Sequence, residues 1–181
     1  MCDLGTGSGC LLLLLSGRAT GLDLYGVELD PTAARAARDN LMENGLGGTV
    51  WTGDWNALPG GTGPFDLVVS NPPYFAQGSG ASGGPARMEG RDGLESLCRT
   101  AARLTRNGGR FALCHRPERL TDLLCALRVC GLEPKRLQLA AHAPDRPPSL
   151  VLVEAVRQGR PGLEVLPTLY RAGPGGREEG A

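Results

Sequence analysis

Residues 1–9 read Met-Cys-Asp-Leu-Gly-Thr-Gly-Ser-Gly. The apolar start is typical of the end of a buried strand, and the glycines that follow predict a tight turn into a helix. Gly5, Gly7 and Gly9 carry no side chain, so backbone amides in this turn can approach a small ligand closely. The stretch therefore predicts a cofactor site at the end of a first strand.

A second motif, Asn71-Pro72-Pro73-Tyr74, follows the apolar run 65–70. In a parallel sheet the two motifs emerge at the same carboxyl edge, where open α/β sheets bind their ligands. We therefore expect a substrate site beside the cofactor site.

The glycine spacing indicates which cofactor the first site binds. The pattern is G-x-G-x-G, whereas a dinucleotide needs G-x-G-x-x-G to seat its pyrophosphate on the helix. Asp3 before the turn and Glu28 at the end of the next apolar run suit a ligand with an amino group and a ribose diol. S-adenosylmethionine has both groups. The alternative is that the stretch is a turn with no ligand, in a chain that contains 28 glycines.

Two more polar positions follow the third predicted strand, residues 49–53. Asp54 is either a turn residue or an acceptor for the amino group of an adenine, and we favour the second interpretation. Trp55 is either a partly buried aromatic residue or a ring that packs on that adenine, and the sequence does not distinguish the two.

The second motif suits methyl transfer to a planar nitrogen, which requires that nitrogen to be held in line with the methyl group. The Asn71 side chain and the Pro72 backbone each offer a carbonyl oxygen to the N–H bonds. Pro73 stiffens the turn, and Tyr74 offers a flat surface for stacking. A sulfonium leaves readily, which agrees with the absence of His and Glu from the motif.

Composition sets the class of protein. The chain has 181 residues, 41% hydrophobic and 21% charged, which predicts one globular domain over residues 1–172 with a loose tail at 173–181. Nineteen basic residues balance nineteen acidic ones, so net charge does not indicate a nucleic-acid partner. The longest leucine run has five residues, short of the roughly 20 that a membrane span needs. With no signal peptide visible, we expect a cytoplasmic protein.

Metal chemistry is not expected. The six cysteines form no C-x-x-C pair, and the two histidines are far apart. The cysteines fall in apolar runs and are interpreted as reduced packing residues.

Strand and helix patterns alternate along the chain and then end in a hairpin. The predicted strands are 2–4, 22–28, 49–53, 65–70, 110–114, 135–140 and 149–155, and the predicted helices are 9–17, 32–44, 92–107 and 117–130. The first helix is apolar almost all round and is expected to be buried. The pattern predicts an α/β, Rossmann-like, seven-stranded and mostly parallel sheet with an antiparallel last strand.

Together these motifs resemble the class I S-adenosylmethionine-dependent methyltransferases that modify exocyclic or amide nitrogens. By that resemblance Glu28 would bind the ribose of the cofactor and Asp54 its adenine. The residues that would line the methionine end are Asp3, Gly5, Gly7 and Gly9.

A narrower resemblance, from Asp3 to about Pro167, is to the bacterial tRNA(Val) adenine-N6 methyltransferases. It is carried by the stretches 71–75, 78–80, 86–89, 115–120, 135–137 and 150–155. It implies N6 methylation of an adenine beside the valine anticodon, with the flipped base against Tyr74 or Phe75. Met88 stands where the family is expected to carry His. Members also carry a segment before the glycine turn, so we expect this chain to be a truncated form that binds the cofactor weakly or not at all.

Two rival functions remain open. A glutamine-N5 methyltransferase of peptide release factors has nearly the same two motifs, and a non-catalytic module could keep the fold alone. Arginines and one lysine are candidates for a basic RNA surface, although scattered arginines are usually a solvated face; they are Arg87, Arg91, Arg116, Arg119, Lys135 and Arg136.

Overall fold

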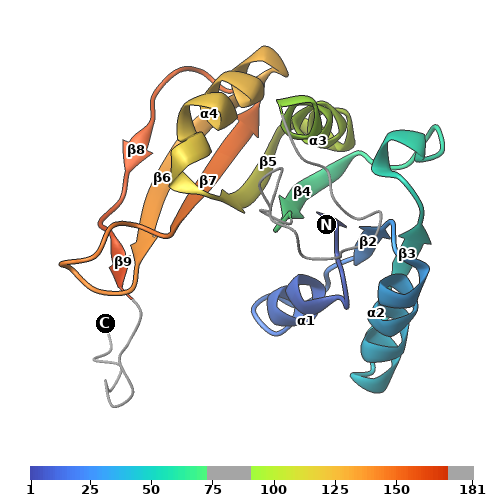
Figure 1. The fold of residues 1–181 in the computed structure, drawn as a ribbon. Helices are drawn as coiled ribbons and strands as arrows, with labels where there is room; N and C mark the ends of the chain where they lie inside the picture. Colours follow the sequence, from blue (N-terminus) through green and yellow to red (C-terminus); the bar gives the residue numbers. More distant parts are fainter. Residues whose placement is uncertain (73–90, 171–181) are drawn as a thin grey trace.

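A mixed β-sheet with helices on both faces forms the centre of the molecule (Figure 1), in a computed structural model that describes residues 1–72 and 91–170. The strands are β1 (Cys2–Leu4), β2 (Tyr25–Glu28), β3 (Thr49–Thr52), β4 (Phe65–Ser70), β5 (Thr105–His115), β6 (Leu132–Ala141), β7 (Leu150–Arg157), β8 (Glu164–Val165) and β9 (Leu169–Tyr170). Their order is β3-β2-β1-β4-β5-β7-β6-β8, and β9 pairs with β6.

Strand directions match the predicted fold class. The pairs that link β3, β2, β1, β4 and β5 are all parallel, and β7 is antiparallel to both β5 and β6. The Rossmann-like, mostly parallel sheet with an antiparallel strand β7 is therefore confirmed. Strands β8 and β9 were not predicted; each has two residues and pairs with the edge strand β6.

Helices lie on both faces of the sheet. They are α1 (Cys10–Ser16), α2 (Pro31–Glu43), α3 (Arg91–Leu104) and α4 (Leu120–Val129), with short 3-10 turns η1 (Trp55–Ala57) and η2 (Pro117–Arg119). Helices α3 and α4 cover one face, and α1 and α2 lie on the other (Figure 1). Helix α2 begins as its sequence predicts, because the Asp30 side chain accepts from the Thr32 amide at 2.9 Å and Pro31 occupies the first turn.

Each face of the sheet has its own apolar core. The larger core lies against α3 and α4, where Phe111, Leu127 and Val151 are fully buried. The smaller core joins α1 and α2 to β1, β2 and β3 through residues such as Leu12 and Ala37. This second core ends near β4, so β5, β7 and β6 have a thinner cover on the α1 face.

Helix α1 corrects one prediction. The run of leucines was expected to be buried all round, yet within α1 only Leu12 is fully buried and Leu14 is 62% exposed. The helix packs by one side, because it lies on a single face of the sheet with α2 as its neighbour.

The cysteine prediction is partly wrong. All six thiols are free, and Cys2 and Cys98 are buried, with burial raising the pKa of each to about 12. Cys10 and Cys125, however, are exposed. Among the described residues no helix combines the length and the apolar character needed to cross a membrane.

Candidate active site

The glycine turn leaves β1 and crosses towards β2. The amides of Gly5 and Thr6 both donate to the Val27 carbonyl, at 2.9 and 3.0 Å. Gly5 and Gly7 have positive φ angles of 76° and 55°, a region that favours glycine. A Cβ at Gly7 would meet no atom within 4 Å among the described residues, so these residues leave this side of the turn uncovered. The backbone is thus shaped to approach a ligand from that side.

Asp3 lies beneath the turn and is only 1% exposed. Its Oδ2 accepts from the Thr6 hydroxyl at 2.7 Å, whereas its buried Oδ1 has no hydrogen-bond partner among the described residues. Burial raises the Asp3 pKa to about 6; the Thr6 hydrogen bond opposes this, and the charge of Glu28 adds to it. A buried carboxylate oxygen without a partner is costly unless a ligand donor reaches it.

Glu28 ends β2 on the other side of the turn and is 8% exposed. Its Oε2 accepts from the Gly7 amide at 2.8 Å and its Oε1 from the Asp30 amide at 2.9 Å. These bonds fix the carboxylate, and each oxygen keeps acceptor capacity for a second donor. The arrangement suits a pair of ligand hydroxyls.

Asp54 follows the end of β3 and lies near Glu28. The residue before it, Gly53, donates its amide to the Glu28 carbonyl at 2.8 Å. The exposed Asp54 uses Oδ1 to cap η1, accepting from the amide and the side chain of Asn56 at 2.8 and 3.0 Å. Trp55 points back towards the glycine turn, with its ring 3.7 Å from the position that a Cβ on Gly5 would occupy. Its indole N–H faces the Ser96 hydroxyl at 3.4 Å.

The second motif begins directly beside the glycine turn. The buried Ser70, the last residue of β4, donates its hydroxyl to the Leu4 carbonyl at 2.7 Å. Leu4 is the last residue of β1 and precedes Gly5, so Asn71 leaves the sheet one strand away from the turn. Asn71 is exposed at this edge and Pro72 is buried.

Cys114, near the end of β5, contacts Asn71 from the other side. Ser70 pairs with Leu113 in the parallel register, so the next rung brings Asn71 opposite Cys114. The thiol donates to the Asn71 side-chain oxygen, with 2.9 Å between sulfur and oxygen. Sequence reasoning treated Cys114 as a packing residue. The missed signal is its place at the carboxyl end of a strand that neighbours β4.

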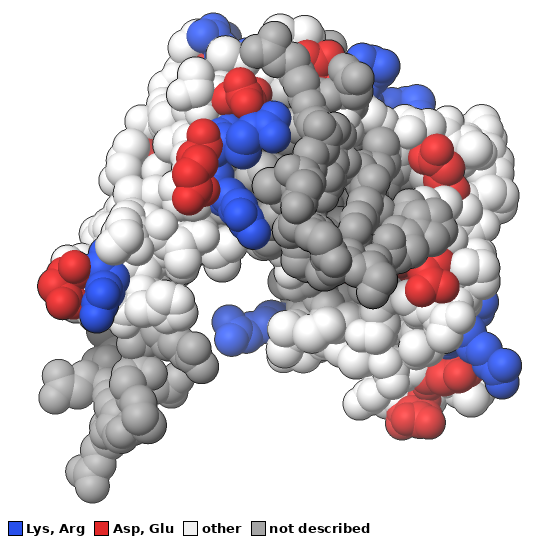
Figure 2. Space-filling view, in the orientation of Figure 1, with Lys and Arg blue, Asp and Glu red and all other residues white. Residues whose placement is uncertain are grey.

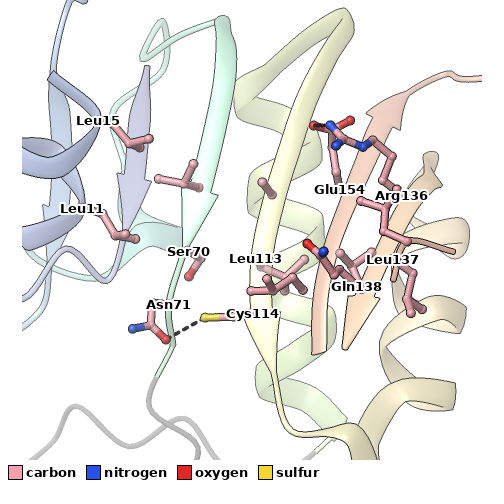
Figure 3. A pocket seen from close by; sticks show the side chains of 15 residues that line it. Leu11, Leu15, Ser70, Asn71, Leu113, Cys114, Arg136, Leu137, Gln138 and Glu154 are labelled. Carbon is pink, nitrogen blue, oxygen red and sulfur yellow. Dashed lines mark hydrogen bonds and ion pairs between the residues drawn. The ribbon is translucent and has the colours of Figure 1, made fainter. Parts of the chain in front are cut away.

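A cavity of about 320 Å³ runs from Asn71 and Cys114 along the α1 face of the sheet (Figure 3). Leu11 and Leu15 of α1 form one wall, and apolar residues of β5 and β7 form the floor. Arg136 and Glu154 stand at its far side. Asn71 therefore lies where this cavity meets the carboxyl edge.

The structure brings together most of the residues predicted for the site. Asp3, Gly5, Gly7, Glu28 and Asn71 lie on the adjoining ends of β1, β2 and β4. Gly9 is the N-cap of α1, with a φ of 84°, and Asp54 follows the end of β3. Pro73, Tyr74 and Phe75 lie outside the described residues, as do Met88 and Arg87. No group of three metal-ligand side chains occurs in the described part of the chain.

Two of the six residues predicted for a basic surface, Arg119 and Arg136, lie beside acidic side chains. Arg119 pairs with Asp122 at 2.7 Å, Arg136 lies 3.9 Å from Glu154, and Lys135 donates to the Arg160 carbonyl. In the view of Figure 2, the acidic and basic side chains of the described residues are interspersed.

The site fits S-adenosylmethionine. The buried Asp3 oxygen matches an ammonium group, the fixed Glu28 carboxylate matches a ribose diol, and the open glycine turn admits the ligand between them. A Rossmann-like sheet of this order is the fold of the class I S-adenosylmethionine-dependent methyltransferases. The chain belongs to the family described as Methyltransferase small domain, which matches residues 1–118.

Similar sequences agree with this class. A tRNA1(Val) (adenine(37)-N6)-methyltransferase of Porphyromonas gingivalis is 32% identical over 161 residues, covering 84% of this chain and 63% of the relative. A release factor glutamine methyltransferase of Rhodospirillum rubrum is 36% identical over 158 residues, covering 80% and 48%. The chain thus spans less than two thirds of the length of these curated relatives. The resemblance expected from the motifs is confirmed.

Solved structures share the fold at low sequence identity. A protein of Agrobacterium tumefaciens described as a predicted O-methyltransferase aligns with a TM-score of 0.71 and 22% identity, covering 93% of this chain and 78% of the other. The magnesium protoporphyrin IX methyltransferase of Synechocystis, solved with bound S-adenosylmethionine, aligns with a TM-score of 0.62 and 21% identity, covering 86% and 68%.

Proposed function

We propose that this protein transfers a methyl group from S-adenosylmethionine to the N6 amino group of an adenine in tRNA(Val), next to the anticodon. The observation that carries the proposal is the place of Asn71, one strand from the glycine turn and fixed there by the Ser70 to Leu4 hydrogen bond. Similarity to the tRNA1(Val) methyltransferases supports the substrate. A tRNA substrate implies a cytoplasmic protein, whose catalytic domain would span residues 1–172.

When bound, the cofactor supplies an electrophilic methyl group on a sulfonium. The residues proposed to hold it are Asp3 for the amino group, Glu28 for the ribose and Asp54 for the adenine amino group. Gly5, Gly7 and Gly9 give the backbone the room to approach it.

In the substrate site, the Asn71 side-chain oxygen and the Pro72 carbonyl oxygen would each accept a hydrogen bond from one N–H group of the target amine. These two hydrogen bonds would hold the nitrogen in place and favour the pyramidal geometry in which its lone pair can attack the methyl group. Pro73 would stiffen this turn, and Tyr74 and Phe75 would stack on the base once it leaves its helix. A strong general base is not required, because the amine becomes acidic as the new bond forms.

A second candidate function is methylation of a glutamine amide in a peptide release factor. A planar amide nitrogen requires the same two hydrogen-bond acceptors as the adenine amine. The release factor glutamine methyltransferase of Rhodospirillum rubrum is 36% identical to this chain. A competition assay separates the two functions: total tRNA and purified release factor are offered together with S-adenosylmethionine that carries a labelled methyl. We expect label in tRNA that nuclease digestion releases as N6-methyladenosine, and label in the release factor instead would overturn the proposal. Label in neither acceptor would favour a non-catalytic module.

Asn71→Ala tests the proposed acceptor. We expect turnover to fall by about 100-fold, the size typical of losing one preorganised transition-state contact. The affinity for S-adenosylmethionine, measured by calorimetry, should remain within about twofold, because Asn71 is not among the proposed cofactor residues. Asn107→Ala, an exposed asparagine on β5 away from the carboxyl edge, is the matched control. A variant as fast as the parent would remove Asn71 from the mechanism.

A further inference from the structure

We infer that Cys114 is a positioning residue: its thiol fixes the orientation of the Asn71 side-chain amide, and with it the direction from which the target nitrogen must approach. The inference rests on the proposed function, in which Asn71 accepts the target N–H, and it adds a residue from a different strand to the site.

The contact is set by the sheet. Asn71 and Cys114 each follow the last residue pair of β4 and β5, Ser70 and Leu113, so they lie opposite each other one step beyond it. Both ends are anchored, because Ser70 is tied to β1 through its hydroxyl and β5 is paired with β7 from Arg110 to His115. The thiol therefore reaches the Asn71 oxygen from a fixed position, with sulfur and oxygen 2.9 Å apart (Figure 3).

The direction of this hydrogen bond matters for catalysis. An amide side chain can rotate by half a turn at little steric cost, which exchanges its oxygen for its NH2 group. A donor at Cys114 favours the orientation in which the oxygen lies between β4 and β5. A carbonyl oxygen has two lone pairs, so it can accept from the thiol and also from a substrate N–H. The target nitrogen must then approach over the gap between β4 and β5.

A thiol suits this role because it is a weak donor. The thiol biases the orientation of the amide. It withdraws little electron density from the Asn71 oxygen, which must also accept a hydrogen bond from the substrate N–H. A side chain without a donor would fill similar space and remove the contribution of Cys114 to the amide orientation.

Three variants separate the donor from the volume of the side chain. Cys114→Ser keeps a donor, Cys114→Ala removes it, and Cys114→Val removes it while filling the space. Cys125→Ala, an exposed cysteine on α4, is the matched control. For Cys114→Ala and Cys114→Val we expect kcat to fall by about fivefold, the effect of one ordinary hydrogen bond. KM for S-adenosylmethionine should be unchanged, and Cys114→Ser should recover at least half of the parent kcat.

Coupling to Asn71 is the sharper kinetic test. In the Asn71→Ala background, Cys114→Ala should have no further effect on turnover, since there is no amide left to orient. A further fivefold loss there would show that Cys114 acts through the structure of β5, and the inference would be wrong.

A spectroscopic test does not depend on activity. The chain has five asparagines, so labelling with 15N-asparagine gives five side-chain NH2 signals, of which the Asn71 pair is assigned from Asn71→Ala. Cys114→Ala should lower the order parameter of the Asn71 side chain, while Cys114→Ser and Cys125→Ala should preserve it. An equally ordered Asn71 in Cys114→Ala would overturn the inference. A parent that methylates neither acceptor would overturn the proposed function, and these spectra would still decide the role of Cys114.

Discussion

The Asp3 carboxyl links cofactor binding to pH. It is buried, its Oδ1 has no partner in the described ranges, and burial raises its pKa to about 6. Below that pH the folded protein holds a proton on Asp3, which must leave before the carboxylate can pair with an ammonium group. We expect calorimetry to show S-adenosylmethionine binding about tenfold more weakly at pH 5 than at pH 7. Asp3→Asn should bind weakly at both values, and a parent affinity that does not change with pH would remove Asp3 from the cofactor site.

The same group predicts a pH dependence of stability in the absence of ligand. The folded-state pKa of Asp3 lies above its ordinary value of 3.8, so its contribution to the unfolding free energy is complete below pH 3.8 and is lost as pH rises through about 6. A shift of this size corresponds to about 3 kcal/mol. Urea titrations should therefore show the parent losing stability relative to Asp3→Asn between pH 4 and pH 7. A constant gap between the two proteins would contradict the raised pKa.

The sequence-based prediction of the site rested on residues inside local motifs, and it missed a contact made between strands. Asp3 was predicted because it precedes the glycine turn, and Glu28 because it ends the next apolar run. Cys114 was missed because its contact with Asn71 depends on the β4 and β5 register, which a single sequence does not give. Thr6 was missed for a simpler reason: its role is to cover one oxygen of Asp3.

At the scale of elements, the turn before α1 also positions two helices against each other. Gly9 has a φ of 84°, and a Cβ there would lie 3.3 Å from the Cβ of Ala37 on α2. Gly45, after α2, has a similar φ of 65° but would meet no atom within 4 Å among the described residues. Gly45→Ala should therefore cost only the backbone strain, about 1 kcal/mol, while Gly9→Ala should cost about 1 to 2 kcal/mol more from overpacking.

Urea unfolding of the two variants measures this difference directly. The pair controls for backbone strain, because both substitutions place alanine at a positive φ. Equal costs would mean that α1 can move away from α2 without penalty, contrary to the close contact at Ala37.

Some element bounds followed from local sequence signals, but the helix predicted over 92–107 ends at Leu104, and β5 begins at Thr105. Strand β4 has the predicted bounds, and α2 has the predicted cap at Asp30. The exposed side of α1 could not be predicted, because five consecutive leucines carry no period that marks a buried face. Strands β8 and β9 could not be predicted either, since two residues give no alternation and their pairing with β6 depends on the path of the chain after β7.

At the scale of the whole molecule, the two faces of the sheet differ in how thickly they are covered. Helices α3 and α4 bury one side of β5, β7 and β6, while the α1 side of the same strands opens into the cavity of about 320 Å³. Two adjacent residues of β7 show the difference between the sides of the sheet. Val151 is fully buried, whereas Leu152 lines the cavity and is half-buried.

Because of this difference in cover, we expect Val151→Ala to lower the free energy of unfolding more than Leu152→Ala does. Leu152→Ala removes more carbon atoms than Val151→Ala, and in an evenly covered sheet it would cost more. Here Val151→Ala should cost about 2 kcal/mol, because it leaves a void among packed side chains, whereas Leu152→Ala should cost about 1 kcal/mol, because its side chain already borders open space. Denaturant unfolding of both variants gives the order. If Leu152→Ala proves the more costly, the cavity is covered in solution, and the site at the end of the cavity where Asn71 meets Cys114 is more enclosed than the structure shows.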